Sequence, residues 1–321
     1  NADGRTDLYI ANDMNPNFLY PNKGDGTFED LTEISGAAFD ERGQAQSGMG
    51  VDAEDINGDG RPDLFVTNFA NEYNTLYDNL AVEDPKSSDP KGIKTVAFLD
   101  TTAYVGLAAD SMPWVGWGCA LADWDSDGWP DVFVSNGHVD DNRKALGQEI
   151  DYDEPALLFH NVSTGDPDLT KRRFKLATKD AGAYFDAYHV GRGAAFGDID
   201  GDGDIDILLN HKDQAAAVLR NDTPRGDNRF VRLKLVGTRS NRDAIGARVE
   251  ITSGALTIFR PRKGGGSLES SNDPYLVVGL GQAGETVGLT VRWPSGQISK
   301  VEKLATNQTH EIVEPRSKEG T

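Results

Sequence analysis

The sequence predicts an all-β protein in which a partial β-propeller is followed by a small antiparallel β-sandwich or barrel. One unit with fixed landmarks recurs through residues 1–225, and short apolar runs between turn residues follow one another inside each unit. No long segment has the 3.6-residue apolar period of an amphipathic helix. A unit of several short strands is about the size of a propeller blade, and because one blade cannot bury both of its faces, neighbouring units are expected to stack.

An aspartate-rich loop is the first landmark of each unit. Counted from its first aspartate, the loop has oxygen-bearing side chains at positions 1, 3, 5 and 9 and a glycine at position 6. The three complete copies are Asp55, Asn57, Asp59, Gly60 and Asp63; Asp123, Asp125, Asp127, Gly128 and Asp131; and Asp198, Asp200, Asp202, Gly203 and Asp206. Position 7 is Arg61, Trp129 and Asp204. The chain begins inside another copy, truncated to Asn1, Asp3, Gly4, Arg5 and Asp7. In chain order these are loops 1 to 4, loop 1 being the truncated copy.

Further landmarks surround each loop. Two glycines precede the complete loops, at 48 and 50, 116 and 118, and 191 and 193. An apolar run follows position 9, at residues 8–10, 64–66, 132–134 and 207–209. Later each unit has two apolar residues, one variable residue and an asparagine, which is Asn22, Asn79, Asn161 or Asn221. Each unit therefore reads as several short strands joined by turns.

The spacing within the loops predicts bound Ca²⁺, in three complete sites and one truncated site. Oxygens at alternate positions converge when a loop curls tightly, glycine at position 6 permits the turn, and the carbonyl at position 7 adds a ligand. The loops contain no histidine or cysteine, which favours calcium over zinc or iron. A helix–loop–helix site would need glutamate at position 12, where the chain has Val66, Val134 and Leu209. The alternative is that these are solvated turns, and loop 1 is expected to bind poorly or not at all.

The repeats resemble the FG-GAP/VCBS repeats of integrin-α-like β-propellers. The remainder resembles the ASPIC/UnbV domain that follows such repeats in the cartilage acidic protein family and its bacterial relatives. Residues 239–249, Gly279-Leu280-Gly281 and Val291-Arg292-Trp293-Pro294-Ser295-Gly296 carry this second resemblance. It implies a secreted or surface-exposed calcium-binding protein. It also implies a propeller of about seven blades, whereas this chain supplies roughly three and a half, so that either upstream blades are missing or another chain closes the ring.

The domain organisation follows from a change of pattern. We expect propeller repeats over 1–225, a β-domain over 226–315 and a polar tail over 316–321. Strands are expected at 230–236, 247–252, 255–259, 275–278, 287–293, 297–304 and 310–313. The glycine-rich stretch 263–267 is expected to be a flexible hairpin loop. The arginines of the β-domain could dock on the acidic repeats, the alternative being solvated surface charge.

Composition excludes some functions. The 52 acidic against 32 basic residues give a net charge of −20, which argues against a nucleic-acid partner because phosphate binding needs a basic surface. No apolar run reaches the roughly 18 residues of a membrane span. Cys119 is the single cysteine, so no intrachain disulfide is possible and the fold needs another source of stability.

The predicted function is that of an extracellular calcium-binding structural or interaction protein. Its calcium-stiffened loops would present a surface to a protein or glycan at the cell surface, or to other copies in an assembly. It would be secreted or surface-exposed, a periplasmic location being possible. The alternative is a propeller enzyme, a lyase or a sugar-modifying enzyme, with a metal and His138 in the propeller mouth. No catalytic residue is assigned, because no catalytic motif occurs. Asn161, Asn221 and Asn307 head glycosylation sequons.

Overall fold

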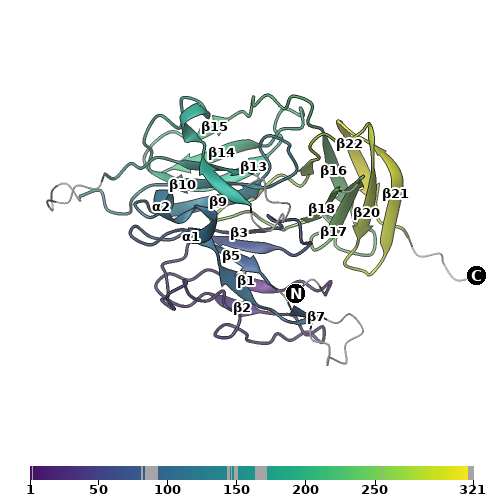
Figure 1. Cartoon of the computed structure of the whole chain (residues 1–321), viewed down its shortest axis with the longest axis horizontal. Coiled ribbons are helices and arrows are strands. Elements are labelled where there is room, and N and C mark those ends of the chain that lie inside the picture. The colour runs from purple at the N-terminus through teal and green to yellow at the C-terminus, as the bar shows by residue number, and fades with distance from the viewer. Residues whose placement is uncertain are drawn as a thin grey trace, which may run out of the picture.

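The computed structural model describes residues 1, 3–80, 82–83, 93–142, 145, 147, 151–162, 172–254 and 256–316. These residues form antiparallel sheets that follow one another like the blades of a propeller, with two further sheets at one side (Figure 1). The predicted all-β propeller fold is confirmed. Most of the tail expected at 316–321 lies outside the described residues.

The repeat region forms four antiparallel sheets, which we call blades 1 to 4. Blade 1 contains β1 (Leu8–Ile10) and β2 (Phe18–Tyr20). Blade 2 contains β3 (Val51–Glu54), β4 (Asp63–Val66), β5 (Thr75–Asn79) and β8 (Phe98–Asp100). Blade 3 contains β9 (Gly116–Ala122), β10 (Asp131–Asn136), β11 (Leu157–Val162) and β12 (Arg173–Leu176). Blade 4 contains β13 (Gly191–Gly197), β14 (Asp206–His211) and β15 (Ala217–Leu219). The short strands β6 (Val82–Glu83) and β7 (Ile93–Thr95) pair as a separate ribbon.

Helical structure among the described residues is short. It consists of α1 (Thr102–Val105), α2 (Ala108–Ser111) and the 3₁₀ turn η3 (Thr178–Asp180). Helix α1 ends at Gly106, whose positive φ of 92° lets its amide bond to the carbonyl of Thr102. None of these segments has the length and apolar character that a bilayer-spanning helix requires.

The glycine pairs before the loops are explained by the first strands of blades 2 to 4. Strands β3, β9 and β13 lie side by side, each followed by its Asp loop and an antiparallel partner. A Cβ atom on Gly50 would lie 2.0 Å from the carbonyl oxygen of Trp117, and one on Gly118 would lie 2.5 Å from the amide nitrogen of Ala194. The backbones of neighbouring first strands therefore approach too closely for any side chain at these positions.

The C-terminal region is a two-sheet sandwich. One sheet contains β16 (Phe230–Val236), β19 (Leu276–Gly279) and β22 (Gln308–Val313). The other contains β17 (Arg248–Ser253), β18 (Leu256–Pro261), β20 (Thr286–Arg292) and β21 (Ile298–Ala305). Alternate residues such as Val231, Leu233, Val249 and Ile251 are buried between the sheets. Strands β16 and β22 pair in parallel, whereas antiparallel pairing was expected throughout.

The buried side chain of Glu314 connects the segment that follows β16 with the turn between β20 and β21. Its carboxylate accepts hydrogen bonds from the amides of Thr238, Arg239 and Ser240, and from the hydroxyls of Ser240 and Ser295. Burial alone would raise the pKa of Glu314, but these donors lower it to about 2. Two of the three segments that carry the ASPIC/UnbV resemblance therefore meet at one acidic side chain.

The glycine-rich stretch 263–267 is not a free hairpin loop, as the sequence led us to expect. The Lys263 ammonium pairs with Asp52 at 2.7 Å and with Glu54 at 3.2 Å, both on β3. The Ser267 hydroxyl accepts a hydrogen bond from the Cys119 amide on β9. Further along, the Asp273 amide donates to the Phe196 carbonyl on β13. Residues 263–273 thus cross the first strands of three blades, and contacts with other elements hold them in place.

We predict that Gly118→Ala destabilises the protein by about 1–3 kcal/mol, because the new methyl group would overlap the backbone of β13. The measurement is the melting temperature by circular dichroism. Gly284→Ala is the matched control, since its Cβ would lie no closer than 3.9 Å to Thr286 O. Equal melting temperatures for the two variants would contradict the close approach of the first strands.

Candidate metal centres

Backbone amides shape each Asp loop from within. The position-1 carboxylates of Asp55, Asp123 and Asp198 accept a hydrogen bond from the position-6 glycine at 2.9, 2.8 and 3.1 Å. The position-5 carboxylates accept from the position-7 amide, at distances between 2.8 and 2.9 Å in all four loops. The glycine at position 6 has positive φ in every copy, which allows the chain to turn back on the first aspartate. The sequence spacing therefore produces the curled loop that was predicted.

The position-9 aspartate joins its loop to the rest of the blade. One oxygen accepts from the amide of the landmark asparagine, at 2.8, 2.8, 2.7 and 2.8 Å for the pairs Asp7–Asn22, Asp63–Asn79, Asp131–Asn161 and Asp206–Asn221. In loops 2 to 4 the other oxygen accepts from the amide at position 2, on Ile56, Trp124 and Ile199. The asparagine that recurs in the sequence is thus a structural partner of the loop.

Loops 3 and 4 bring carboxylate oxygens together as a cation site requires. One oxygen each from Asp123, Asp125 and Asp131 lies within 4.8 Å of the others, and Asp198, Asp200 and Asp206 form the same arrangement. In loop 2, the side chains of Asp55, Asn57 and Asp63 are all buried, and position 3 offers an amide oxygen. Clusters of oxygen donors fit a hard divalent cation such as Ca²⁺.

Burial makes these carboxylates costly to ionise together. It raises the pKa of Asp123 well above its ordinary value, and the charges of Asp127 and Asp131 raise it further. Burial, with a further contribution from Asp125, raises the pKa of Asp127 to about 6. Burial likewise raises the pKa of Asp204 to about 6, although Arg225 opposes it. A bound cation would relieve this repulsion.

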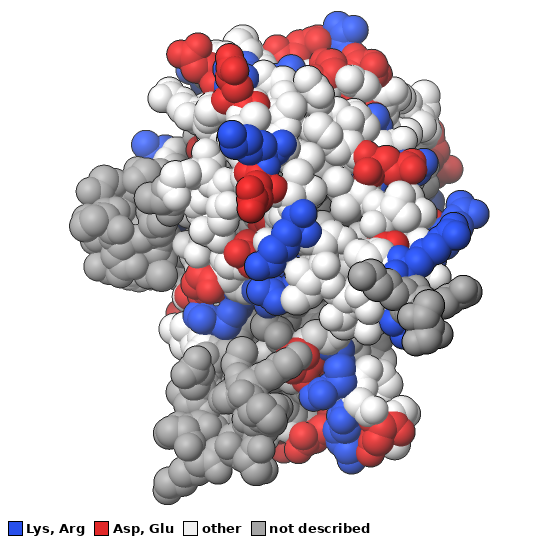
Figure 2. All heavy atoms as spheres, turned by 90° about the vertical axis from the view of Figure 1, so that its right-hand side faces the viewer, with Lys and Arg blue, Asp and Glu red and all other residues white. Residues whose placement is uncertain are grey.

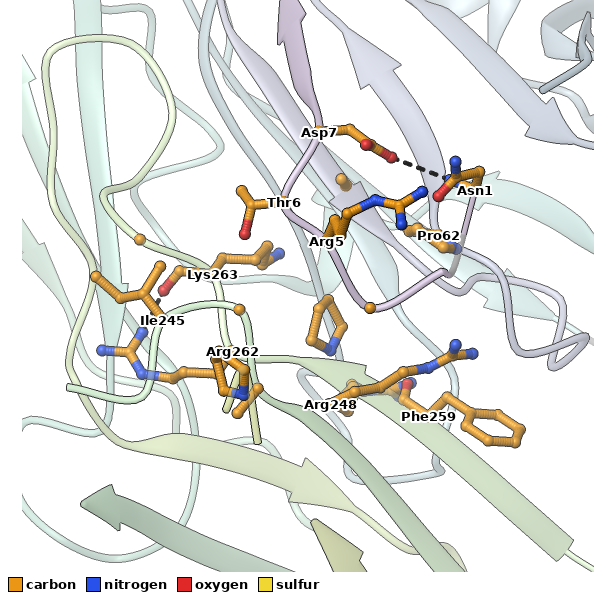
Figure 3. A pocket seen from close by; sticks show the side chains of 18 of the residues that line it. Asn1, Arg5, Thr6, Asp7, Pro62, Ile245, Arg248, Phe259, Arg262 and Lys263 are labelled. Atoms are coloured by element: carbon orange, nitrogen blue, oxygen red, sulfur yellow. Dashed lines mark hydrogen bonds and ion pairs between the residues drawn. The ribbon is translucent and has the colours of Figure 1, made fainter. Parts of the chain in front are cut away.

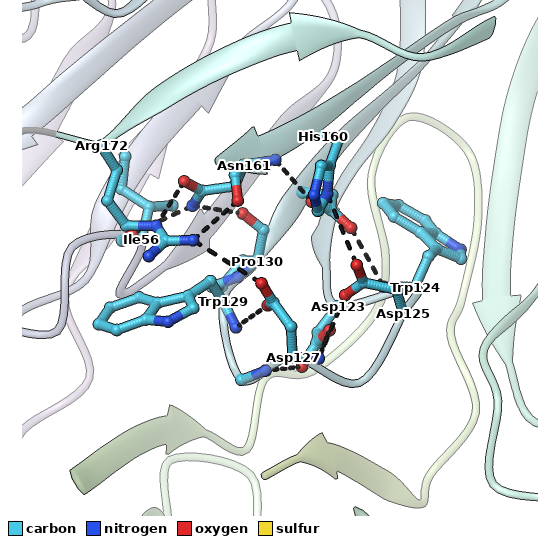
Figure 4. A network of polar contacts seen from close by, with 12 residues as sticks. Ile56, Asp123, Trp124, Asp125, Asp127, Trp129, Pro130, His160, Asn161 and Arg172 are labelled. Atoms are coloured by element: carbon cyan, nitrogen blue, oxygen red, sulfur yellow. Dashed lines mark hydrogen bonds and ion pairs between the residues drawn. The ribbon is translucent and has the colours of Figure 1, made fainter. Parts of the chain in front are cut away.

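An arginine also pairs with an acidic side chain of each loop, at position 5 in loops 1 to 3 and at position 7 in loop 4. In loops 1 and 2 it is the position-7 residue, so that Arg5 pairs with Asp3 and Arg61 pairs with Asp59. In loop 3, Arg172 lies 3.8 Å from Asp127 and stacks on Trp129 at 4.2 Å from the ring centre (Figure 4). In loop 4, Arg225 lies 3.3 Å from Asp204. The position-5 carboxylates of loops 1 and 2 are therefore partly neutralised without a metal.

In blades 2 and 3 the variable residue before the landmark asparagine contacts the loop, which the sequence analysis missed. His160 lies 3.0 Å from Asp131 and 3.8 Å from Asp125, and with Asp125 and Asp127 it forms a further group that could hold an ion (Figure 4). The bond to Asp131 raises the pKa of His160. Asp78 accepts a hydrogen bond from Asn57 at the same place in blade 2. The sequence signal that could have identified this residue is its fixed position directly before the landmark asparagine, whose backbone amide bonds to the position-9 aspartate.

The C-terminal sandwich rests on loops 2 to 4. Arg248 donates to the carbonyl of Gly60, and Arg260 donates to the carbonyl of Gly128 at 3.0 Å. Arg232 lies 3.2 Å from the carboxylate of Asp198. The position-6 glycines meet the same domain, because a Cβ would lie 3.2 Å from Phe259 at Gly60, 3.4 Å from Ile258 at Gly128 and 2.1 Å from Phe230 at Gly203. The expectation that the arginines dock on the acidic repeats agrees with these contacts. On the outer face of the sandwich, basic and acidic side chains are interspersed among neutral ones (Figure 2).

A cleft of about 1050 Å³ lies between blade 1, β3 and the sandwich. Arg5, Asp7, Arg248, Arg262 and Lys263 are among its lining residues (Figure 3). Several of these groups already have partners, since Arg5 pairs with Asp3 and Lys263 pairs with Asp52. The cleft therefore offers a polar rim of mixed charge.

His138, named for the enzyme alternative, and the single cysteine Cys119 are both buried. His138 is fully buried, and its Nδ1 atom accepts a hydrogen bond from the Asp140 amide at 3.0 Å. Burial raises the pKa of the Cys119 thiol to about 12, so this cysteine stays protonated at neutral pH.

The three sequons differ in accessibility. Asn161 is fully buried, and its amide nitrogen donates to the carbonyls of Ile56 and Pro130. Attachment of a glycan there is incompatible with this fold. Asn221 donates to the Trp124 carbonyl, whereas Asn307 is exposed.

Comparison with known proteins confirms both resemblances. Residues 1–66 match the family model described as FG-GAP-like repeat, and residues 237–319 match the model described as ASPIC and UnbV. Cartilage acidic protein 1 from Homo sapiens is 27% identical over 98% of this chain and 43% of its own length. The proteins of the same name from Mus musculus and Xenopus tropicalis are also 27% identical, over 98% and 91% of this chain and 44% and 40% of theirs. The chain therefore spans less than half the length of these relatives.

We predict that the protein without calcium becomes less stable as the pH rises from 4 to 7.5. A carboxyl group with a raised pKa in the folded state stabilises the fold below its unfolded value, near 3.8, and that stability is lost as the pH passes its folded value, which is about 6 for Asp127. The contribution of Asp127 is about 1–3 kcal/mol. The measurement is urea unfolding in chelator across this range. Asp127→Asn should show a flatter profile, and an unchanged slope would contradict the assignment.

Proposed function

We propose that this chain is part of an extracellular interaction protein in which Ca²⁺, bound by the Asp loops, fixes the C-terminal sandwich on the propeller blades. The resemblance to cartilage acidic protein 1 and the FG-GAP-like repeat support an interaction role. The net charge of −20, the buried oxygen clusters and the absence of histidine within the loops themselves support calcium. Weak calcium sites of extracellular modules, with dissociation constants of about 10⁻⁴–10⁻³ M, suit a compartment where calcium is abundant.

The residues that would hold the ions differ from loop to loop. Loop 3 offers Asp123, Asp125 and Asp131, with Asp127 and His160 beside them. Loop 4 offers Asp198, Asp200 and Asp206. Loop 2 offers Asp55, Asn57 and Asp63, while loop 1 has Asp3 and Asp7 already paired with Arg5 and the terminal ammonium group of Asn1. When bound, the ion would supply positive charge that neutralises the clustered carboxylates.

One observation carries this proposal: all three complete loops lie at the contact between the blades and the sandwich. Arg248 and Arg260 bond to backbone carbonyls of loops 2 and 3, and Arg232 bonds to loop 4. An arginine can reach these oxygens only while the loop keeps its curled shape. A cation that rigidifies the loop therefore stabilises the contact, and by linkage the contact must stabilise the bound cation.

The partner surface is proposed to be formed jointly by the blades and the sandwich. The cleft between blade 1 and the sandwich exists only while the two are docked, because both contribute its lining. Its mixed polar rim and its volume suit a polar segment of a protein or a glycan. Fixing the sandwich in place would preorganise such a surface and lower the entropic cost of binding.

We predict that 10 mM CaCl₂ raises the melting temperature above that in chelator. Sites with dissociation constants of about 10⁻⁴–10⁻³ M each contribute about 1.4–2.7 kcal/mol at this concentration. Asp200→Asn should reduce the increase, because it removes one negative charge from the oxygen cluster of loop 4 while the side chain stays isosteric and exposed. Asp213→Asn, which changes an exposed aspartate outside the loops, is the control. A calcium response that is the same in all three proteins would contradict a contribution of the Asp200 charge to calcium binding in loop 4.

We further predict that Arg260→Met weakens the calcium response as well as the fold. The variant leaves the buried Gly128 carbonyl without its charged donor, at a cost of about 1–3 kcal/mol. The midpoint of the calcium titration, followed by tryptophan fluorescence, should move to higher concentration. Arg292→Met changes an exposed arginine of the same domain and should leave the midpoint unchanged. A variant that is less stable but keeps the wild-type midpoint would show that sandwich and loops are not coupled.

A further inference from the structure

One residue position changes its chemistry from blade to blade while its place in the repeat stays fixed. It is the variable residue directly before the landmark asparagine, which in chain order is Pro21, Asp78, His160 and Arg220. In blades 2 and 3 its side chain contacts the Asp loop of the same blade. In blade 4, Arg220 instead pairs with Asp222 at 2.9 Å, and both side chains are exposed. The position can therefore add a different kind of ligand atom to each loop.

His160 brings a nitrogen atom to the carboxylates of loop 3. Its Nδ1 atom faces the loop, 3.0 Å from Asp131 and 3.8 Å from Asp125 (Figure 4). Zinc binds imidazole nitrogen and carboxylate oxygen at about 2.0–2.2 Å, so that ligand atoms around a tetrahedral zinc ion are about 3.3 Å apart. The two distances lie on either side of this value. Asp125, Asp127 and His160 each offer one ligand atom, and the three atoms lie within 4.8 Å of one another.

The backbone of the loop orients the two carboxylates of this group. One oxygen of Asp125 accepts a hydrogen bond from the Asp127 amide at 3.1 Å, and its other oxygen is the one that faces His160. One oxygen of Asp127 accepts from the Trp129 amide at 2.8 Å, and its other oxygen lies 3.8 Å from Arg172. Each carboxylate is therefore fixed through one oxygen, and its second oxygen faces a side chain that can carry positive charge.

The group that contains the nitrogen is accessible from solvent, unlike the rest of the loop. The side chains of His160, Asp125 and Asp127 are 38%, 30% and 29% exposed. Asp123 and Asp131, which belong to the group with oxygen ligands alone, are buried. An ion from solution can thus reach the imidazole, and water can complete its coordination.

We propose that loop 3 binds Zn²⁺ through His160, Asp125 and Asp127, and that it takes zinc in preference to calcium. Imidazole nitrogen is a good ligand for zinc, whereas calcium prefers six to eight oxygen ligands. The ion takes the place of the proton at Nδ1, and in the neutral imidazole that proton is then carried by Nε2. This inference rests on the proposed binding of cations by the Asp loops and deepens it, because it assigns a different cation to one loop.

Loops 2 and 4 have no such nitrogen ligand among their described contacts. Asp78 places a further carboxylate at the equivalent position beside loop 2, where it accepts a hydrogen bond from Asn57 at 2.9 Å. Arg220 adds no ligand atom to loop 4, since guanidinium groups only donate hydrogen bonds. Both loops therefore keep oxygen ligands, which suit calcium. The residue before the landmark asparagine thus determines which class of cation its loop prefers.

Isothermal titration calorimetry of the calcium-free chain with ZnCl₂ tests the proposal. His160→Asn is the informative variant, because its side-chain amide can still donate a hydrogen bond to Asp131 but its nitrogen does not bind zinc. We expect zinc affinity to fall by about tenfold or more in this variant. The increase in melting temperature with CaCl₂ should be the same as in the wild type. His310→Asn changes a histidine of the sandwich and should bind zinc like the wild type.

Equal zinc affinities of the wild type and His160→Asn would overturn the proposal, as would a wild type that does not bind zinc. Either result leaves the calcium function intact if CaCl₂ still raises the melting temperature. Zinc binding that depends on His160 without any response to calcium would instead contradict the calcium function alone.

A measurement on the wild type covers the case in which the variant does not fold. The chain has five histidines, whose imidazole resonances can be followed by NMR as ZnCl₂ is added. The resonances of His160 should shift first. A zinc-dependent shift confined to the other four histidines would contradict the assignment.

Discussion

The hydrogen bond from the backbone amide of the landmark asparagine to the carboxylate of the position-9 aspartate is the contact on which each blade depends. It occurs in all four repeats at nearly the same distance, including the truncated one. It fixes the end of the Asp loop against a strand that follows much later in the chain. Because the acceptor is a buried carboxylate, the bond is charge-assisted and removing either partner would leave a polar group unsatisfied. Loop geometry and blade geometry are therefore set by the same residue.

This arrangement has an electrostatic cost that the rest of the molecule offsets. Carboxylates that accept backbone amides are turned inward, where burial raises the pKa of Asp55, Asp63 and Asp123. Nearby arginines pair with the position-5 carboxylates of loops 1 to 3 and with Asp204 at position 7 of loop 4. Arginines of the sandwich bring further positive charge to loops 2 to 4. The acidic side chains of the loops therefore lie where arginine side chains supply positive charge and where a bound ion could add more.

Local features were predictable from the sequence, whereas contacts between repeats were only partly so. The loops, the short strands and the strand positions of the sandwich follow from spacing and alternation within a few residues, as at β16 and β20. His160 and Arg172 were missed because they reach loop 3 from a strand and a segment distant in sequence. The stretch 263–267 has the composition of a mobile loop, and only the first strands of neighbouring blades give it contacts. The buried sequon at Asn161 shows that a local motif does not determine accessibility.

The loops differ in how much positive charge other segments or a bound ion must supply, because the residue at position 7 is an arginine in loops 1 and 2 but a tryptophan or an aspartate in loops 3 and 4. In loops 1 and 2 an arginine at that position supplies a permanent cation beside position 5. In loop 3 a tryptophan takes its place, and Arg172 and His160 approach from elsewhere. In loop 4 position 7 is Asp204, which adds a further carboxylate, so that the repulsion within this loop is opposed by Arg225 and Arg232. Because loops 3 and 4 each bring three carboxylate oxygens together and have no arginine at position 7, stability should respond to calcium mainly through these two loops, and both of them contact the sandwich.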